Sequence, residues 1–238
     1  MQKSFELAPG RIAHASGCIW LPEIRTVLIA DVHLGYGWAQ RRRGQLGPVS
    51  DGGARDKLAA LVTELQPGRI VFLGDIVHAP RPAALERELV EATLRLVSEQ
   101  AEVIFVRGNH DRGFAADYPQ FAVRMCEHWQ SGDIVAIHGD KPTAEESSRH
   151  VVLGHLHPAL SIHDDAGAGQ RIPVFLTGAR GSVLPAFSPF AAGYSVNHGL
   201  PREIRDLLGG AIEVLAATGN RVVRLGPLAG IRKKLPPR

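Results

Sequence analysis

Five short aliphatic runs along the chain each end at polar residues that can bind a metal ion. The runs cover residues 26–30, 69–73, 102–106, 133–137 and 150–153. Near-continuous apolar runs of this length are typical of strands that are buried on both faces of a sheet. We therefore predict five buried strands with a polar cluster at the carboxyl end of each.

Helical patterns lie between the first three predicted strands. Residues 56–65 form one pattern, and residues 83–100 form another in which Leu85, Leu89 and Leu96 recur at helical spacing. Strands that alternate with helices predict an α/β fold with helices outside a sheet. Ligands bind such sheets at the carboxyl ends of the strands, so the five polar clusters are expected to converge.

The last third of the chain has a different pattern. Further strands are predicted over residues 171–177, 181–184, 214–216 and 221–225. The last two are expected to pair across a turn at residues 218–220. Residues 44–53 are rich in Gly, Pro and Ser, which predicts a long mobile loop. We find no internal repeat or long linker, so a single domain over residues 1–238 is expected.

The composition is ordinary for a globular protein, with 45% hydrophobic and 21% charged residues. No apolar run is long enough to cross a bilayer, and the first residues lack a secretory signal, so no membrane association is expected. Cys18 and Cys126 are the only cysteines. Two cysteines argue against a disulfide scaffold and favour a reducing, cytoplasmic setting.

The polar clusters contain the ligand types that a pair of divalent metal ions requires. The inventory is Asp31, His33, Asp75, Asn109, His138, His155 and His157. Hydrolysis of a phosphate ester needs an activated water and neutralised charge, and two ions about 3.5–4 Å apart supply both. Nitrogen and oxygen ligands of this kind suit manganese, iron or zinc better than calcium.

The motifs differ in how specific they are. His138-Gly139 alone would more often mark a hydrogen-bonded loop histidine, and Gly74-Asp75 alone a simple turn. The motif at residues 108–111, Gly-Asn-His-Asp, is the most specific, because its glycine lets the backbone turn sharply beneath the ligands. His155 and His157, two residues apart on an extended strand end, are expected to project the same way.

Taken together, the motifs resemble the calcineurin-like metallophosphoesterase superfamily. The resemblance rests on Asp31-x-His33, Gly74-Asp75, Gly108-Asn109-His110-Asp111, His138-Gly139 and Gly154-His155-x-His157. It implies an α/β fold in which two mixed β-sheets form a sandwich flanked by helices.

The same resemblance assigns roles to the residues of the motifs. One metal ion would be held by Asp31, His33, Asp75 and His157. The other would be held by Asp75, Asn109, His138 and His155, so that Asp75 bridges the two ions. His110 would be no ligand; it would contact the phosphate and protonate the leaving oxygen, and Asp111 would orient it.

A narrower likeness extends over nearly the whole chain. It rests on the sequences at residues 16–22, 33–36, 42–44, 74–78 and 184–187, followed by Gly193. These resemble the ligase-associated DNA damage response endonuclease group and its archaeal phosphoesterase relatives. The likeness implies a manganese-dependent phosphodiesterase that acts on DNA, with DNA-repair ligases, helicases or nucleases as partners. The endonuclease group often has lysine at the position of Tyr36. The tyrosine at this position is more similar to the archaeal relatives.

Three arginines near the motifs are candidate contacts for substrate phosphate: Arg42, Arg43 and Arg112. For each, a solvated surface or an ion pair with nearby acids fits the sequence about as well. The same holds for the basic tail formed by residues 232–234 and Arg238. The net charge of +3 neither demands nor excludes a polyanionic partner, and the sequence leaves the oligomeric state open.

Two other functions compete with a DNA phosphodiesterase. A small-molecule phosphatase or a cyclic-nucleotide phosphodiesterase would use the same metal ligands and the same acid, because these do not encode the size of the substrate. A non-catalytic scaffold would be expected to have lost the acid histidine or several ligands. His110 and all seven ligands are present, which argues against the scaffold.

Overall fold

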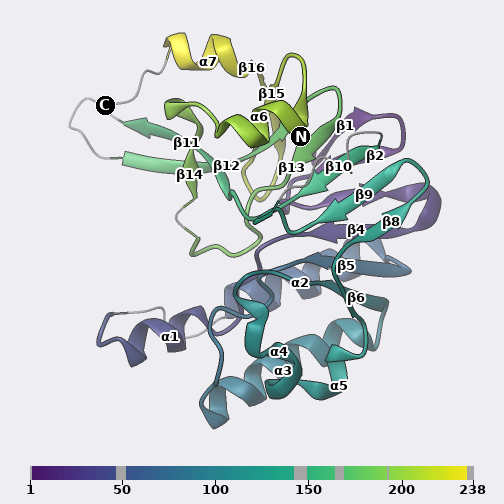
Figure 1. Cartoon of the computed structure of the whole chain (residues 1–238), viewed down its shortest axis with the longest axis vertical. Helices are drawn as coiled ribbons and strands as arrows, with labels where there is room; N and C mark the ends of the chain where they lie inside the picture. The colour runs from purple at the N-terminus through teal and green to yellow at the C-terminus, as the bar shows by residue number, and fades with distance from the viewer. Residues whose placement is uncertain (1, 47–51, 142–148, 164–168, 192, 235–238) are drawn as a thin grey trace.

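The aliphatic runs of the sequence form the centre of two stacked, mixed β-sheets with helices on both outer faces (Figure 1). The computed structural model describes residues 2–46, 52–141, 149–163, 169–191 and 193–234. The first sheet contains, in spatial order, β1 (Ser4–Ala8), β2 (Arg11–His14), β3 (Ile19–Leu21), β4 (Thr26–Ile29), β5 (Arg69–Leu73), β6 (Glu102–Val106) and β7 (Met125–Cys126). Strands β4 to β7 are parallel, and β1 to β4 are antiparallel.

The second sheet is also mixed. Its main path is β14 (Tyr194–Ser195), β11 (Pro158–His163), β12 (Gly169–Thr177), β13 (Gly181–Val183), β10 (His150–Leu153), β9 (Ile134–Ile137) and β8 (Trp129–Ser131). Two further strands, β15 (Glu213–Ala217) and β16 (Val222–Pro227), join it through β12. Strands β9, β10 and β13 are parallel neighbours, which places their carboxyl ends at one edge of the sheet.

Alternate residues of the central strands face different cores. In β4, Leu28 faces the core between the two sheets, whereas Val27 and Ile29 face the helices that cover the first sheet. In β10, Val152 faces the core between the sheets, and Val151 faces the helices over the second sheet. After the polar first residue, Thr26 in β4 and His150 in β10, each strand is apolar because it has no solvated face.

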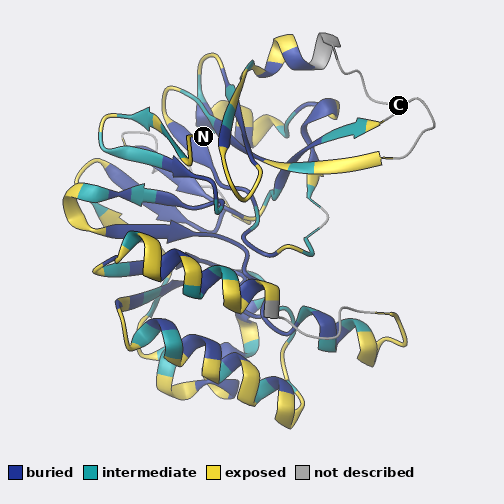
Figure 2. Cartoon of the chain, turned by 180° about the vertical axis from the view of Figure 1, so that it is seen from behind, coloured by how far each residue is buried: buried dark blue, intermediate teal, exposed yellow. Residues whose placement is uncertain are grey.

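Helices cover the two outer faces of the sandwich. They are α1 (Tyr36–Arg42), α2 (Gly52–Leu65), α3 (Ala84–Ser98), α4 (Phe114–Asp117), α5 (Pro119–Ala122), α6 (Arg202–Leu208) and α7 (Leu228–Lys234), with 3-10 turns η1 (Pro22–Ile24), η2 (Asp111–Gly113) and η4 (Val196–His198). In Figure 1, α2 and α3 lie against the first sheet, and α6 and α7 lie on the side of the second. Figure 2 shows buried strands between helices that are buried on one side only. No helix in the described part of the chain has the length and apolarity to cross a membrane.

The predicted fold class, two mixed sheets flanked by helices, is confirmed. The predicted strands at 69–73, 102–106 and 150–153 match β5, β6 and β10, and the helix predicted over 83–100 is α3. The expectation of one domain over residues 1–238 stays a prediction.

The amino-terminal hairpin and α1 are features that the hydrophobic pattern did not predict. β1 and β2 are mostly half-exposed at the sheet edge, so they lack the apolar run that identified the central strands. The mobile loop predicted over 44–53 falls partly on residues 47–51, which lie outside the described residues, and α2 begins at Gly52.

Candidate metal centre

The predicted ligands lie where the carboxyl ends of parallel strands from both sheets meet. β4, β5 and β6 are parallel neighbours in the first sheet, and β9 and β10 are parallel neighbours in the second. The ligands on the loops that follow these strands are Asp31, His33, Asp75, Asn109, His138, His155 and His157. Five segments that are far apart in the sequence therefore bring their polar side chains to one place.

Five of the seven ligands have a left-handed backbone, which only a few per cent of non-glycine residues adopt. The φ angles are 56° at Asp31, 50° at His33, 48° at Asp75, 61° at His155 and 49° at His157. Residues in this region cost free energy and persist where the surrounding structure holds them, which is typical of functional sites.

The expectation that His155 and His157 project the same way from an extended strand end was wrong. Both residues lie beyond β10 with positive φ, so the strand has already ended. Nδ1 of His155 lies 3.1 Å from Nε2 of His138, whereas Nε2 of His157 lies 3.4 Å from Nε2 of His33. The two rings therefore serve different clusters.

The first cluster consists of Asp31, His33, Asp75 and His157, whose ligand atoms all lie within 4.8 Å of one another. Nε2 of His157 is 3.2 Å from Oδ1 of Asp31. Nε2 of His33 is 3.8 Å from Oδ2 of Asp75. This is the set that the family resemblance implied for one metal ion.

The second cluster shares Asp75 with the first and adds His138 and His155. Nε2 of His138 lies 3.5 Å from Oδ1 of Asp75 and 3.0 Å from Oδ1 of Asn109. The two oxygens of Asp75 thus face different clusters. This is the position that a bridging carboxylate would occupy.

The donor sets fit divalent cations. Nδ1 of His138 lies 3.0 Å from the carbonyl oxygen of Leu73, which can only accept, so this nitrogen donates. Nε2 faces the oxygens of Asn109 and Asp75, at 3.0 and 3.5 Å, where a divalent cation would bind all three groups. Oδ1 of Asp31 is buried and has no hydrogen bond of good geometry within the described structure. Such an orphaned polar atom is costly unless an unseen partner satisfies it.

The charges within the first cluster support the same conclusion. Burial alone would raise the pKa of Asp31, but the rings of His157, His138 and His33 outweigh it and hold that pKa below its usual value. Burial would lower the pKa of His157, but Asp31 and Asp75 outweigh it, so that this pKa is raised. The carboxylate of Asp31 is therefore ionised, and a cation beside it would stabilise the buried negative charge.

Close contacts hold the loops of this centre together, both between the two sheets and within the first sheet. Oδ2 of Asp31 accepts a hydrogen bond from the backbone N–H of His155 at 2.9 Å. A Cβ on Gly108 would lie 2.2 Å from the backbone nitrogen of Asp75, and one on Gly154 would lie 2.7 Å from Oδ2 of Asp31. Only glycine allows these loops to approach so closely.

His110 lies beside the first cluster, with its ring centroid 5.2 Å from that of His33. Its Nδ1 lies 2.7 Å from the carbonyl oxygen of His78, and the two rings stack with centroids 5.4 Å apart. The backbone N–H of His110 donates to Oδ1 of Asp75 at 2.9 Å. His78 therefore fixes the orientation of the His110 ring through its backbone carbonyl oxygen.

Asp111 does not provide the hydrogen bond that orients His110. Its Oδ1 accepts from the backbone N–H groups of Ile76 and Val77, at 2.9 and 3.3 Å, and its Oδ2 accepts from that of Gly108 at 3.0 Å. Asp111 thus joins the loop after β5 to the loop after β6. Burial, followed by the charge of Asp75, raises the pKa of Asp111 to about 6.

Cavities open on two sides of the centre. A cavity of about 500 Å³ includes His157 in its lining. A second cavity, of about 330 Å³, is lined by Asn109 and His138, and by the basic residues Arg107, Arg112, His128 and Lys141. The centre is therefore reached from the side of each cluster.

A model of the calcineurin-like phosphoesterase family matches residues 24–173, which is more than half of the chain. The chain belongs to the calcineurin-like phosphoesterase family. The match covers every predicted ligand, and it supports a metal-dependent hydrolase acting on phosphoesters. A search of curated proteins finds no match.

Solved structures show the same fold. The crystal structure of the Pseudomonas putida nuclease MPE aligns with a TM-score of 0.70 and 23% sequence identity, covering 94% of this chain and 100% of that one. At this identity the likeness establishes the fold. A point mutant of a cold-active protein tyrosine phosphatase aligns over 84% of this chain and 80% of its own, with 10% identity and a TM-score of 0.35, which carries no argument.

The three arginines proposed for substrate contact lie in different surroundings in this phosphoesterase. Arg112 is exposed and lines the cavity beside Asn109. Arg42 instead donates to Oε2 of the buried Glu86 at 2.9 Å, so a phosphate would have to compete with that carboxylate. Arg43 is exposed at the end of α1. Burial, followed by the charges of His110 and Arg43, lowers the pKa of His78 to about 4.

Proposed function

We propose that this phosphoesterase is a dinuclear, manganese-dependent phosphodiesterase that cleaves DNA and functions in DNA repair. The observation that carries the proposal is the pair of ligand clusters that share Asp75. Two ions held on either side of the Asp75 carboxylate would be close enough to act on a single phosphate group. Iron or zinc would fit the same nitrogen and oxygen atoms.

In this proposal the metal ions and His110 have separate chemical roles. The two ions, when bound, neutralise phosphate charge and lower the pKa of a water. A protonated His110 keeps its Nδ1 hydrogen on the carbonyl oxygen of His78 and gives its Nε2 proton to the leaving oxygen. The ring returns to the neutral form without moving, because the hydrogen bond to His78 is the same before and after the transfer.

Cleavage of a diester rather than a monoester is supported by the two cavities. A phosphodiester carries a group on each side of the phosphorus, whereas a monoester carries one. The cavity beside His157 and the cavity beside Asn109 offer space on both sides of the centre.

DNA as the substrate is supported by charge and by the narrower sequence likeness. Arg112 and Lys141 line the cavity beside Asn109, where a neighbouring phosphate of a polynucleotide would lie. Arg107 also lines this cavity, paired with Glu127 at 3.3 Å, and Asp140 is a second acid there. The likeness of residues 16–22 and 184–187 to the repair endonuclease group points the same way. The Pseudomonas putida protein that shares the fold is a nuclease.

The test is a comparison of substrates after removal of metal and reloading with manganese, iron or zinc. The substrates are bis-nitrophenyl phosphate, a nitrophenyl monoester, a cyclic nucleotide and short DNA strands, single and double. We expect hydrolysis of DNA and of the aryl diester with manganese, and none after chelation. Turnover confined to the monoester or to the cyclic nucleotide would instead support the small-molecule alternative.

A further inference from the structure

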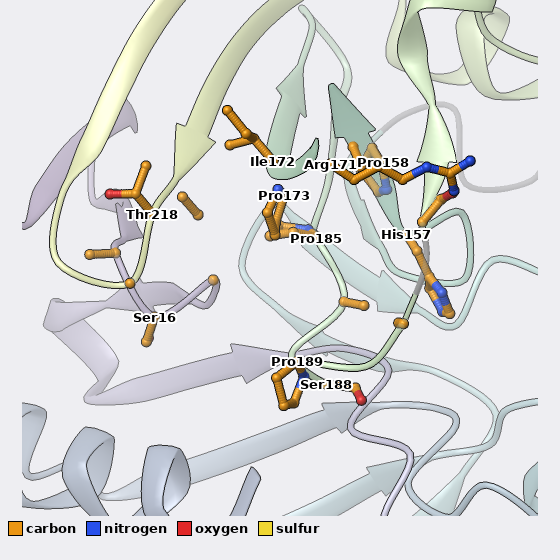
Figure 3. A pocket seen from close by; sticks show the side chains of 18 of the residues that line it. Ser16, His157, Pro158, Arg171, Ile172, Pro173, Pro185, Ser188, Pro189 and Thr218 are labelled. Carbon is orange, nitrogen blue, oxygen red and sulfur yellow. The ribbon is translucent and has the colours of Figure 1, made fainter. Parts of the chain in front are cut away.

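The larger cavity has walls from three parts of the chain that the metal centre does not use. They are the loop at residues 15–17, the segment at residues 185–189 and the β-turn at residues 217–219. Figure 3 shows Pro173 and Pro185 between Thr218 on one side and His157 on the other. At about 500 Å³, the cavity falls within the size range of small-ligand sites.

One wall of this cavity is attached to the backbone of a metal ligand. The backbone N–H of Phe187 donates to the carbonyl oxygen of Ala30 at 2.8 Å, and that of Ser188 donates to the carbonyl oxygen of Asp31 at 3.1 Å. His157 completes the lining at the side of the metal centre. A molecule in the cavity would therefore be held at a fixed position relative to the first metal cluster.

Lys57 supplies a cation on this wall. Its Nζ donates to the carbonyl oxygen of Phe187 at 2.9 Å and lies 4.0 Å from the centroid of the Phe187 ring. No carboxylate pairs with it among the residues that the structure describes. Burial lowers the pKa of Lys57 to about 8. An ammonium in this state retains N–H groups for an acceptor on a ligand.

The remaining lining is largely apolar, with polar side chains from Ser16, Gln170, Ser188 and Thr218, and no aspartate or glutamate lies among the described lining residues. Pro173, Pro185 and Pro189 contribute apolar rings, and Arg171 adds a second cation. Apolar rings, hydrogen-bonding side chains and cations together suit an aromatic group that bears hydrogen-bond acceptors and is joined to phosphate. A nucleotide has this chemistry.

We propose that this cavity binds the nucleotide next to the scissile phosphodiester, with its base against the proline rings and an acceptor atom of the base bonded to Lys57. The inference rests on the proposed function and deepens it, because it assigns part of the substrate to a defined site. The metal centre then provides the reaction, and the cavity provides preference for a nucleoside over other ester groups.

The test compares two diesters that differ only in the group this cavity would hold. One is a deoxynucleoside nitrophenyl phosphodiester, and the other is bis-nitrophenyl phosphate. We expect Lys57→Met to lower kcat/KM for the nucleoside diester, relative to that for the aryl diester, by about 10-fold or more, as for loss of a hydrogen bond to a charged group. Lys3→Met removes an exposed lysine whose side chain pairs with Glu64 and does not line the cavity, and it should leave the ratio unchanged.

A second variant tests the cavity without altering Lys57. Thr218→Trp should fill the space from the exposed turn and lower the same ratio, whereas Thr218→Ala loses the same turn hydrogen bonds without filling it. An unchanged ratio in both Lys57→Met and Thr218→Trp would overturn the inference, as would equal losses on both diesters. A wild-type enzyme that cleaves neither diester would overturn the proposed function itself.

Discussion

Nε2 of His157 lies 3.2 Å from Oδ1 of Asp31, a fully buried oxygen that makes no hydrogen bond in the described structure. The pKa of His157 is raised and that of Asp31 is lowered, so that the metal-free pair favours a proton on the His157 ring beside an ionised Asp31. A metal ion in the first cluster has to displace that proton.

Metal affinity should therefore depend on pH in a defined direction. Because the pKa of His157 is raised, the ring is protonated at higher pH than an ordinary histidine, and affinity should fall as pH falls through that pKa. Above it, affinity should level off. We expect a slope of about tenfold per pH unit and release of about one proton, measured by calorimetry in buffers of different ionisation enthalpy. The measurement spans about pH 6 to 8, a range around the ordinary pKa of histidine. A metal affinity that stays constant over this range would contradict this account.

Asp75→Asn should remove the shared ligand charge and empty both clusters. We expect metal content and diester turnover to fall together, turnover by more than about 100-fold. Metal analysis and kinetics on the same preparation measure both. Asp206→Asn, at an exposed position of α6, is the matched control and should retain both properties. A fully active Asp75→Asn enzyme would refute the bridging role.

His110→Ala should slow the departure of poor leaving groups more than that of good ones. Loss of a general acid costs about 10²–10⁴-fold when the leaving oxygen needs a proton, and a nitrophenolate needs none. The measurement is kcat for DNA and for bis-nitrophenyl phosphate in the same variant. His198→Ala, an exposed histidine in η4, is the control. Equal losses on the two substrates would argue against an acid role.

Gly108→Ala should disrupt the centre without removing a ligand. A Cβ here would lie 2.2 Å from the backbone nitrogen of Asp75 and 2.4 Å from its Oδ1, so the bridging carboxylate has to move. We expect loss of bound metal with retention of secondary structure. Metal analysis measures the first, and circular dichroism measures the second. Gly230→Ala, in α7 with open space around the new methyl group, should keep its metal and gain about 0.5–1 kcal/mol in helix stability. Normal metal content in Gly108→Ala would show that the loop tolerates the shift.

His150 should make the metal-free protein less stable in acid. Burial lowers its pKa to about 4 from the usual 6.5, so the unfolded chain binds a proton between these values and the folded chain does not. Above the pKa of the unfolded chain, His150 contributes a constant amount to the free energy of unfolding. As pH falls from that value towards the folded pKa, the free energy of unfolding decreases by on the order of 3 kcal/mol.

His150→Gln tests this because glutamine does not titrate and can still hydrogen bond to Ser182, which lies 3.0 Å from Nε2 of His150. The free energy of unfolding in urea, measured across this pH range, should fall less steeply than in the wild type. Parallel slopes in the two proteins would assign the acid sensitivity to other groups, such as His33, whose pKa burial lowers to about 3.

The sequence by itself determined the central strands and the identity of the candidate ligands. Aliphatic runs such as residues 69–73 have no exposed face, so their burial follows from composition alone. The ligands could be named because each directly follows such a run, and parallel strands bring their carboxyl ends to one edge. The edge strand β1 and its neighbour β2 were missed because half-exposed strands leave no comparable signal.

Only the tertiary structure decided which metal cluster each of these side chains joins and which groups fix its orientation. The separation of His155 from His157 depends on backbone angles beyond β10, and the orientation of His110 depends on a carbonyl oxygen at His78. Backbone atoms and left-handed turns carry no residue-type signature. The cavity with Lys57 on its wall exists because α2 packs beside the segment at residues 185–189, a contact between positions 130 residues apart. Contacts of that kind are set by packing, which no local pattern encodes.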